Sequence, residues 1–157
     1  ASQAPPSNPS PVGAQFIELE VDTETGEVEI QRVVYSTDIG QVIHPKSAEG
    51  QVEGGFQQGM GYALMENLQF DEETGACLSA DFLDYKMPTA MEMPSNIETI
   101  FIDSNEPSGP YGGKSMSEMA LIVPAAAIAN AVYNAIGVRI TDLPITPEKV
   151  LRALGKL

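Results

Sequence analysis

The sequence is short of cysteine, histidine, tryptophan and basic residues, and each shortage excludes a class of protein. One cysteine (Cys77) and one histidine (His44) in 157 residues allow no internal disulfide and are too few for a zinc or iron–sulfur site. Eight Lys and Arg against 22 Asp and Glu give a formal charge of −14, which argues against binding to nucleic acid or to an anionic membrane. Because Trp is absent and other aromatics are few, the core is expected to be aliphatic.

The low cysteine content fits a reducing compartment, so we expect a cytoplasmic location. No apolar run of about 18 residues and no basic leader before an apolar stretch are apparent, so neither a membrane span nor a signal peptide is expected. Residues 1–13 are rich in Pro and Ser and predict a linker-like lead-in to one folded portion, residues 14–157. We therefore expect a piece, or one subunit, of a larger protein.

Hydropathy patterns predict an α+β fold. Apolar and polar residues alternate on both sides of a turn at Gly26, which is typical of a hairpin. The later elements are predicted in this order: a helix over residues 47–66, a second hairpin around the 71–75 turn, an irregular connection over residues 84–95, a strand over residues 97–102, an Ala-rich helix over residues 119–136 that is buried on most sides, and a final helix capped by Thr146. Pro124 lies within the first turns of the Ala-rich helix or marks its true start. These elements interleave without a regular βαβ rhythm, which favours the α+β class.

The predicted helix over residues 47–66 is rich in glycine. It contains five glycines, at positions 50, 54, 55, 59 and 61. Each glycine inside a helix costs roughly 1 kcal/mol relative to alanine, so the helix needs a compensating reason for them. Two reasons fit equally well: close packing against another helix, or a bulky ligand lying against the bare backbone.

The loop GPYGGKSMSE, residues 109–118, is the most informative stretch for chemistry. Its glycines allow close approach of the backbone to a ligand, and its serines and backbone N–H groups can hold an oxyanion. It ends in one carboxylate, Glu118, where the Ala-rich helix begins. Glu118 is either a simple charge at a helix end or a general base, and Gln51 is either an ordinary exposed amide or a group that reads a ligand.

Other kinds of site are less well supported by the sequence. His44 precedes a proline and is expected to satisfy a local turn; no G-x-S-x-G elbow or Walker A pattern accompanies it. The two acidic Asp-x-x-Thr-Gly turns could bind calcium, but they lack the spacing of an EF-hand. An acidic calcium-binding module remains an alternative, which a calcium-dependent shift in melting temperature would reveal.

Four spaced segments resemble the xanthine dehydrogenase/aldehyde oxidoreductase family of molybdenum hydroxylases. They are EGQVEGGFQQGMG (49–61), DYKMPTA (84–90), GPYGGKSMSE (109–118) and LPITPE (143–148). The segments occur in the family's order, and the resemblance extends from about residue 14 to the end. It covers only the C-terminal portion of the family's molybdopterin-binding catalytic subunit.

The resemblance implies a role for each matching residue. Glu118 corresponds to the family's catalytic glutamate, a general base for a hydroxyl bound to molybdenum, and Gln51 corresponds to a glutamine that binds the cofactor. Further contacts to the cofactor are expected from Gly55, Gly113, Lys114, Ser115, Met116 and Ser117. No residue of this chain is expected to ligate the metal. The sequence departs from the commoner pattern at Ser115–Ser117 and at Met119-Ala120, which affects the shape of the pocket rather than the carboxylate.

The resemblance also implies an oxidoreductase that works only with partner chains. The expected cofactor is molybdenum-molybdopterin, as the cytosine dinucleotide, with iron–sulfur clusters and FAD on other subunits. The expected partners are a complementary molybdopterin-binding chain, an iron–sulfur subunit and an FAD subunit. The favoured reaction is the hydroxylation of an N-heterocycle, purine- or nicotinate-like, with water as the oxygen source. The alternatives are an aldehyde oxidoreductase of the same family and a non-catalytic assembly or scaffold subunit.

Overall fold

A computed structural model describes residues 6, 7, 9–116 and 118–157 of the chain. It has a three-stranded sheet in the order β1-β2-β3, formed by β1 (Val12–Val21), β2 (Val28–Asp38) and β3 (Ile97–Phe101). The first two strands are antiparallel, and β3 runs parallel to β2. The helices are α1 (Pro45–Leu64), the 3₁₀ turn η1 (Pro110–Gly112), α2 (Met119–Ile122), α3 (Pro124–Ile136) and α4 (Pro147–Ala153). The predicted α+β class is therefore confirmed.

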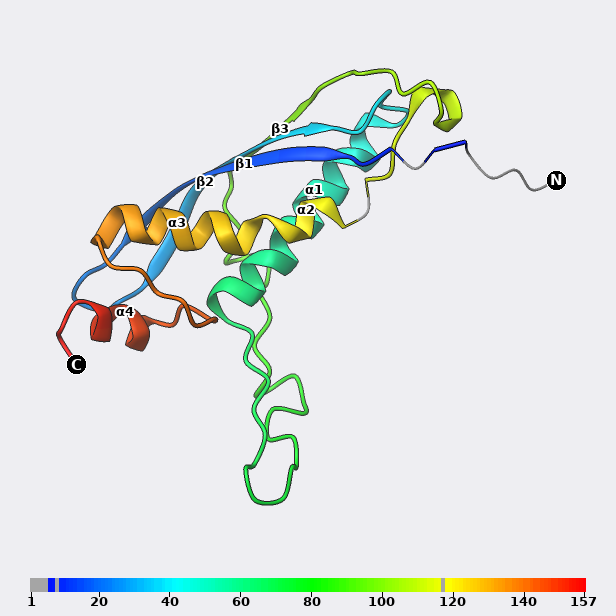
Figure 1. Ribbon diagram of the computed structural model, residues 1–157. Helices are drawn as coiled ribbons and strands as arrows, with labels where there is room; N and C mark the ends of the chain where they lie inside the picture. The colour runs from blue at the N-terminus through cyan, green and yellow to red at the C-terminus, as the bar shows by residue number, and fades with distance from the viewer. Residues whose placement is uncertain (1–5, 8, 117) are drawn as a thin grey trace.

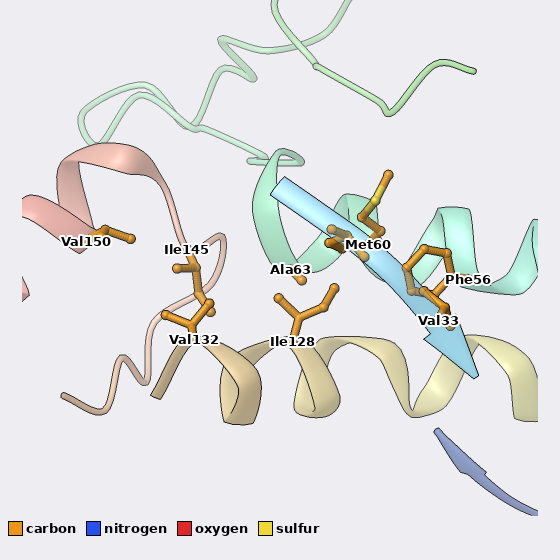
Figure 2. Close-up of a cluster of buried hydrophobic side chains, with 9 residues drawn as sticks. Val33, Phe56, Met60, Ala63, Ile128, Val132, Ile145 and Val150 are labelled. Atoms are coloured by element: carbon orange, nitrogen blue, oxygen red, sulfur yellow. The ribbon is translucent and has the colours of Figure 1, made fainter. Parts of the chain in front are cut away.

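One hydrophobic core holds the sheet and the helices together. Helices α1 and α3 lie on the same side of the sheet, and α4 closes one end (Figure 1). Figure 2 shows side chains from β2 (Val33), α1 (Phe56) and α3 (Ile128) gathered in one buried cluster. Val33, Phe56 and Ile128 are fully buried. Their aliphatic and aromatic surfaces supply the main stabilisation, because burying such a side chain contributes about 1.5–3 kcal/mol.

The first hairpin, α1 and α4 form where the sequence predicts them, and their ends show why. Gly26 adopts φ +83°, which L-residues rarely tolerate, at the turn between β1 and β2. His44 caps α1, since its Nδ1 accepts a hydrogen bond from the Ser47 N–H at 3.1 Å, as expected for a local turn residue. Thr146 caps α4 through the Lys149 N–H. Strand β1 begins at Val12, two residues earlier than predicted.

Three predictions about the other elements need correction. The second hairpin forms its turn and one antiparallel bridge, between Phe70 and Cys77, instead of two full strands. The Ala-rich helix is two helices with a break at Val123, where Pro124 becomes the first residue of α3. Within this chain α3 buries one face only, through Pro124, Ile128 and Val132.

The apolar segment Met119–Ile136 also corrects the expectation that no such run exists. It is long and apolar enough, by length and composition, to cross a membrane, and 22% of it is buried in the chain. A single such segment is weak evidence for a membrane span, because core helices of water-soluble proteins pass the same test. Ile128 and Val132 of this segment lie in the core beneath the sheet (Figure 2).

Residues 66–93 form a long excursion, here called the arm, that leaves the end of α1 and returns to β3. It extends away from the sheet and helices (Figure 1). A hydrogen bond from the Gln57 side chain to the Pro88 carbonyl, at 2.8 Å, ties its returning half to α1. Large apolar side chains along the arm are exposed: Leu68, Phe70, Leu78, Phe82, Leu83, Met87 and Met91.

Candidate functional site

The loop of residues 109–118 lies against the end of β2. Gly113 forms an isolated antiparallel bridge with Gly40, the Gln41 N–H donates to the Gly112 carbonyl at 2.7 Å, and the Lys114 N–H donates to the Ile39 carbonyl at 2.7 Å. Gly40 has φ +66°, and a Cβ there would collide with the Gly112 carbonyl oxygen. Only glycine permits this close approach of two backbones. The sheet therefore sets the position of the loop.

The Lys114 side chain faces the end of β2. Its Nζ lies 2.8 Å from Oδ2 of Asp38, and the two side chains are 10% and 20% exposed. The Asp38 carboxylate also accepts hydrogen bonds from the Ser104 hydroxyl and the Gly40 N–H. These three donors, Lys114 first, lower the pKa of Asp38 to about 2. Because the ammonium group is paired with Asp38, the contact with a cofactor predicted for Lys114 would come from its backbone.

Glu118 directly precedes α2 and its carboxylate is free. Its main-chain carbonyl accepts the Leu121 N–H, so the residue sits at the helix start as predicted, but its side chain forms no capping hydrogen bond. In the part of the chain that the structure describes, the carboxylate makes no hydrogen bond or ion pair, and the residue is exposed. A capping role does not explain this glutamate.

Glu118 lines a cavity of about 360 Å³, which is open on one side. Ser115 and Met119 line it too, together with Pro11, Ile122 and Val123. Among the described residues, the walls are therefore largely apolar, with the Ser115 hydroxyl and the Glu118 carboxylate, which is typical of a small-molecule site. The predicted site residues Glu118 and Ser115 meet here, whereas Ser117 lies outside the described residues.

Helix α1 brings Gln51 to the same region. Gly55 of α1 packs on α2, since a Cβ at Gly55 would lie 2.6 Å from the Cβ of Ala120. Gln51 is exposed one helical turn before this contact, and Glu118 is two residues before Ala120. The packing of α1 on α2 thus places both functional candidates beside one junction of two helices.

Four of the five glycines of α1 fit one or the other of the two explanations offered by the sequence, helix packing or an open surface for a ligand. Gly55 and Gly59 serve helix packing: Cβ atoms there would lie 2.6 Å from Ala120 and from Pro124. Gly50 and Gly54 are exposed and have nothing within 4 Å of the Cβ position. Their bare backbone, next to Gln51, leaves an open surface of the kind that a flat ligand can cover.

Two residues of the hairpin, Gln15 and Tyr35, carry buried polar atoms that were not predicted from the sequence. The Tyr35 hydroxyl is fully buried and has no hydrogen-bond partner among the described residues, and the same holds for the amide atoms of Gln15. Burial raises the pKa of Tyr35. A Cβ on Gly13 would touch both the Tyr35 hydroxyl and the sulfur of Met119, so these groups adjoin the start of α2. Such unpaired atoms are usually satisfied by water or a ligand.

A larger cavity, of about 590 Å³, lies at the opposite end of α1. It is lined by Met60, Met65, Met91 and Met93 with parts of β2, and by no predicted site residue. Its size alone does not make it the site, because the free carboxylate, the glycine loop and the bare helix face all lie elsewhere.

The described residues contain no group of three or more His, Cys, Asp and Glu side chains that could hold a metal ion. What they offer at Glu118 is amide donors, a hydroxyl, a carboxylate and uncovered helix backbone. This set suits an organic ligand held by hydrogen bonds.

Comparisons with known proteins show which family of cofactor-binding proteins this chain resembles. The profile of the molybdopterin cofactor-binding domain matches residues 1–94. The putative xanthine dehydrogenase molybdenum-binding subunit of Escherichia coli is 42% identical over 144 residues, which are 92% of this chain and 19% of that protein. The aldehyde oxidoreductase molybdenum-binding subunit of the same organism is 40% identical, over 92% of this chain and 20% of that protein.

Solved structures agree with these sequence matches. The chain superimposes on the crystal structure of quinoline 2-oxidoreductase from Pseudomonas putida with a TM-score of 0.85 and 31% identity, over 92% of this chain and 18% of that one. The chain thus belongs to the molybdopterin cofactor-binding domains of the xanthine dehydrogenase/aldehyde oxidoreductase family. It spans about a fifth of the length of the curated relatives that it matches.

Proposed function

We propose that the chain forms part of the active site of a molybdenum hydroxylase, with Glu118 as the general base. The observation that carries this proposal is the free carboxylate of Glu118 at the rim of a cavity, directly after a glycine loop fixed to the sheet. Neither helix capping nor an ion pair within the described chain accounts for that carboxylate. Family membership supplies the cofactor that it would face.

The chain's own residues would bind, orient and deprotonate. The Gln51 amide offers a donor and an acceptor to the cofactor, and the bare backbone at Gly50 and Gly54 lets it approach closely. The Gly113–Ser115 backbone would contact its other side. Glu118 would receive the proton of the attacking hydroxyl on a carboxylate oxygen, a role that contributes about 10²–10⁴-fold in rate. The molybdenum cofactor, when bound, supplies the oxidation of the substrate.

The favoured substrate is an N-heterocycle, purine- or nicotinate-like. Support comes from the quinoline oxidoreductase structure and from the xanthine dehydrogenase relative. An aldehyde is the alternative, because an aldehyde oxidoreductase subunit is almost as similar. Turnover of the assembled enzyme with xanthine, nicotinate and benzaldehyde in parallel would separate the two classes.

We further propose partner chains for this site. A complementary molybdopterin-binding part is proposed because the curated relatives are molybdenum-binding subunits and this chain matches about a fifth of their length. The exposed apolar side chains of the arm support such a contact, since exposed patches of this kind mark interaction surfaces. Iron–sulfur and FAD subunits would carry the electrons away, because the chain's one cysteine cannot hold a cluster. We also propose the cytosine dinucleotide form of the cofactor.

Replacement of Glu118 tests the proposed function. In the assembled complex, Glu118→Gln should lower kcat by about 10²–10⁴-fold, since the amide cannot accept a proton, while molybdenum and pterin content stay at the wild-type level. Glu148→Gln on α4, another exposed glutamate, is the matched control and should be fully active. Near-normal turnover of Glu118→Gln would contradict the proposal.

The same preparation decides between an enzyme and a scaffold. A wild-type complex that contains molybdenum and pterin and oxidises one of the three substrates supports the enzyme. A complex without metal or pterin that oxidises none of them supports the non-catalytic assembly subunit.

A further inference from the structure

The ion pair between Asp38 and Lys114 differs from the other ion pairs of the described chain. Lys114 and Asp38 are 10% and 20% exposed, whereas Arg32 and Glu98, paired across β2 and β3, are 47% and 48% exposed. Exposed pairs rarely constrain structure, because water competes for both charges and the side chains stay mobile. A largely shielded pair at 2.8 Å, anchored by further hydrogen bonds, holds its two segments in one arrangement.

Asp38 is held in place by two hydrogen bonds in addition to the one from Lys114. Its Oδ1 accepts the Gly40 N–H at 2.9 Å and the Ser104 hydroxyl at 2.6 Å, which leaves Oδ2 for the ammonium group. The carboxylate thus joins three segments: the end of β2, the segment after β3, and the loop of residues 109–118. Asp38 is the fixed end of the pair, and Lys114 is the end that belongs to the loop.

Lys114 is the last anchor of the loop before Glu118. Its N–H donates to the Ile39 carbonyl and its side chain binds Asp38. Among residues 115, 116 and 118, which the structure describes, none donates a hydrogen bond to the sheet. The next fixed points are Met119, whose sulfur accepts the Thr37 hydroxyl at 3.6 Å, and Ala120, packed on Gly55. Glu118 therefore lies on a short span between two anchors, and one of them is the ion pair.

We propose that Asp38 and Lys114 are positioning residues that hold the loop so that the Glu118 carboxylate faces the cofactor. This inference rests on the proposed function of Glu118. The ion pair does not touch the reacting atoms; it fixes the loop four residues upstream of the base. Because a misplacement of about 1 Å can lower turnover about 10²-fold, loss of the pair is expected to act on kcat.

The test uses the assembled enzyme and two kinds of variant. Asp38→Asn keeps the shape and removes the charge, and Lys114→Met removes the ammonium group. Each should lower kcat about 10–100-fold, with KM and molybdenum content near wild type. The double variant should be no worse than either single variant, because both remove one interaction. Lys114→Arg, which keeps the charge, should restore most of the activity. Glu98→Gln, which breaks the exposed pair on the same sheet, is the matched control and should be fully active.

Hydrogen exchange gives a second readout that does not depend on turnover. In Asp38→Asn, amides of residues 112–116 should exchange faster than in the wild type, while those of β1 and α4 keep their rates. Unchanged exchange in the loop, wild-type kcat, or a loss of activity that only follows a loss of molybdenum would overturn the proposal. If Glu118→Gln proves active, the proposed function fails, whereas the exchange data still decide whether the ion pair holds the loop.

Discussion

At the scale of single residues, the central finding is that the Glu118 carboxylate makes no hydrogen bond or ion pair within the described residues, whereas residues on both sides of it are held by contacts with the rest of the fold. Lys114 is bound to Asp38, Gly113 to Gly40, and Ala120 to Gly55. Among the lining residues that the structure describes, Glu118 and Ser115 are the ones with polar side chains. A free carboxylate on a fixed frame is what a general base requires, because the frame sets its distance from the substrate.

The charge on Asp38 gives a pH prediction at this scale. Hydrogen bonds from Lys114, Ser104 and Gly40 lower the pKa of Asp38 to about 2 from the ordinary 3.8, and Glu106 is the other carboxylate near Lys114. A depressed pKa in the folded state means that the pair stabilises the fold fully above about pH 4, and that this contribution is lost as the pH falls towards 2. The difference in melting temperature between wild type and Asp38→Asn should therefore shrink over that window. A constant difference from pH 5 to pH 2 would contradict the assignment.

At the scale of elements, the packing of α1 on α2 and α3 predicts that alanine substitutions at two adjacent glycines change the free energy of unfolding in opposite directions. Gly54→Ala should stabilise the fold by about 0.5–1 kcal/mol, because its Cβ meets nothing and alanine favours the helix. Gly55→Ala should destabilise it, since the new Cβ would lie 2.6 Å from Ala120. Urea unfolding of the two variants measures both changes, and equal signs would contradict the packing described here.

Gly54→Ala has a second readout in the assembled enzyme. If the cofactor lies against this bare helix face, the same substitution that stabilises the fold should lower molybdenum and pterin content. Full cofactor content would place the cofactor away from Gly54.

Much of the fold was predictable because its signals are local. The Gly26 turn, the Thr146 cap and the helical spacing of Phe56 and Met60 each act within a few residues, and each predicted its element correctly. The start of α3 at Pro124 is one of the two positions that the sequence allowed. The limited pairing of the second hairpin, one bridge at Phe70, was not predicted, because it depends on what the rest of the fold packs against it.

The candidate site was predictable only in part. Glu118 and Gln51 stand out through motif resemblance, and the structure brings their elements together. The role of Asp38 could not be predicted, because it depends on a contact across 76 residues of sequence. The buried Tyr35 hydroxyl was missed for the same reason, since alternation in a strand indicates burial but not the partner.

At the scale of the whole molecule, the chain is acidic and leaves much apolar surface uncovered. The arm and α2 expose large side chains, such as Phe82 at 87% and Ile122, while the formal charge is −14. A chain that spans a fifth of its relatives' length is expected to find this cover in the complementary part. Its partner surface should be apolar with a basic rim.

The arm gives the prediction at this scale. Phe82→Ser and Met91→Ser should each change the free energy of unfolding of the chain by no more than about 0.5 kcal/mol, because both side chains are almost fully exposed. The same changes should weaken binding of the complementary chain at least tenfold in titration calorimetry. Leu157→Ser, an exposed apolar residue at the C-terminus, is the control and should bind normally. Unchanged affinity of the arm variants would show that the arm lies outside the interface.

The most direct test of the central claim is the structure of the assembled, cofactor-loaded complex. The account predicts that the Glu118 carboxylate faces the bound cofactor, with an oxygen within hydrogen-bond reach of it, about 2.6–3.2 Å or through one water. A Glu118 side chain turned to bulk solvent, with the cofactor bound elsewhere, would contradict it.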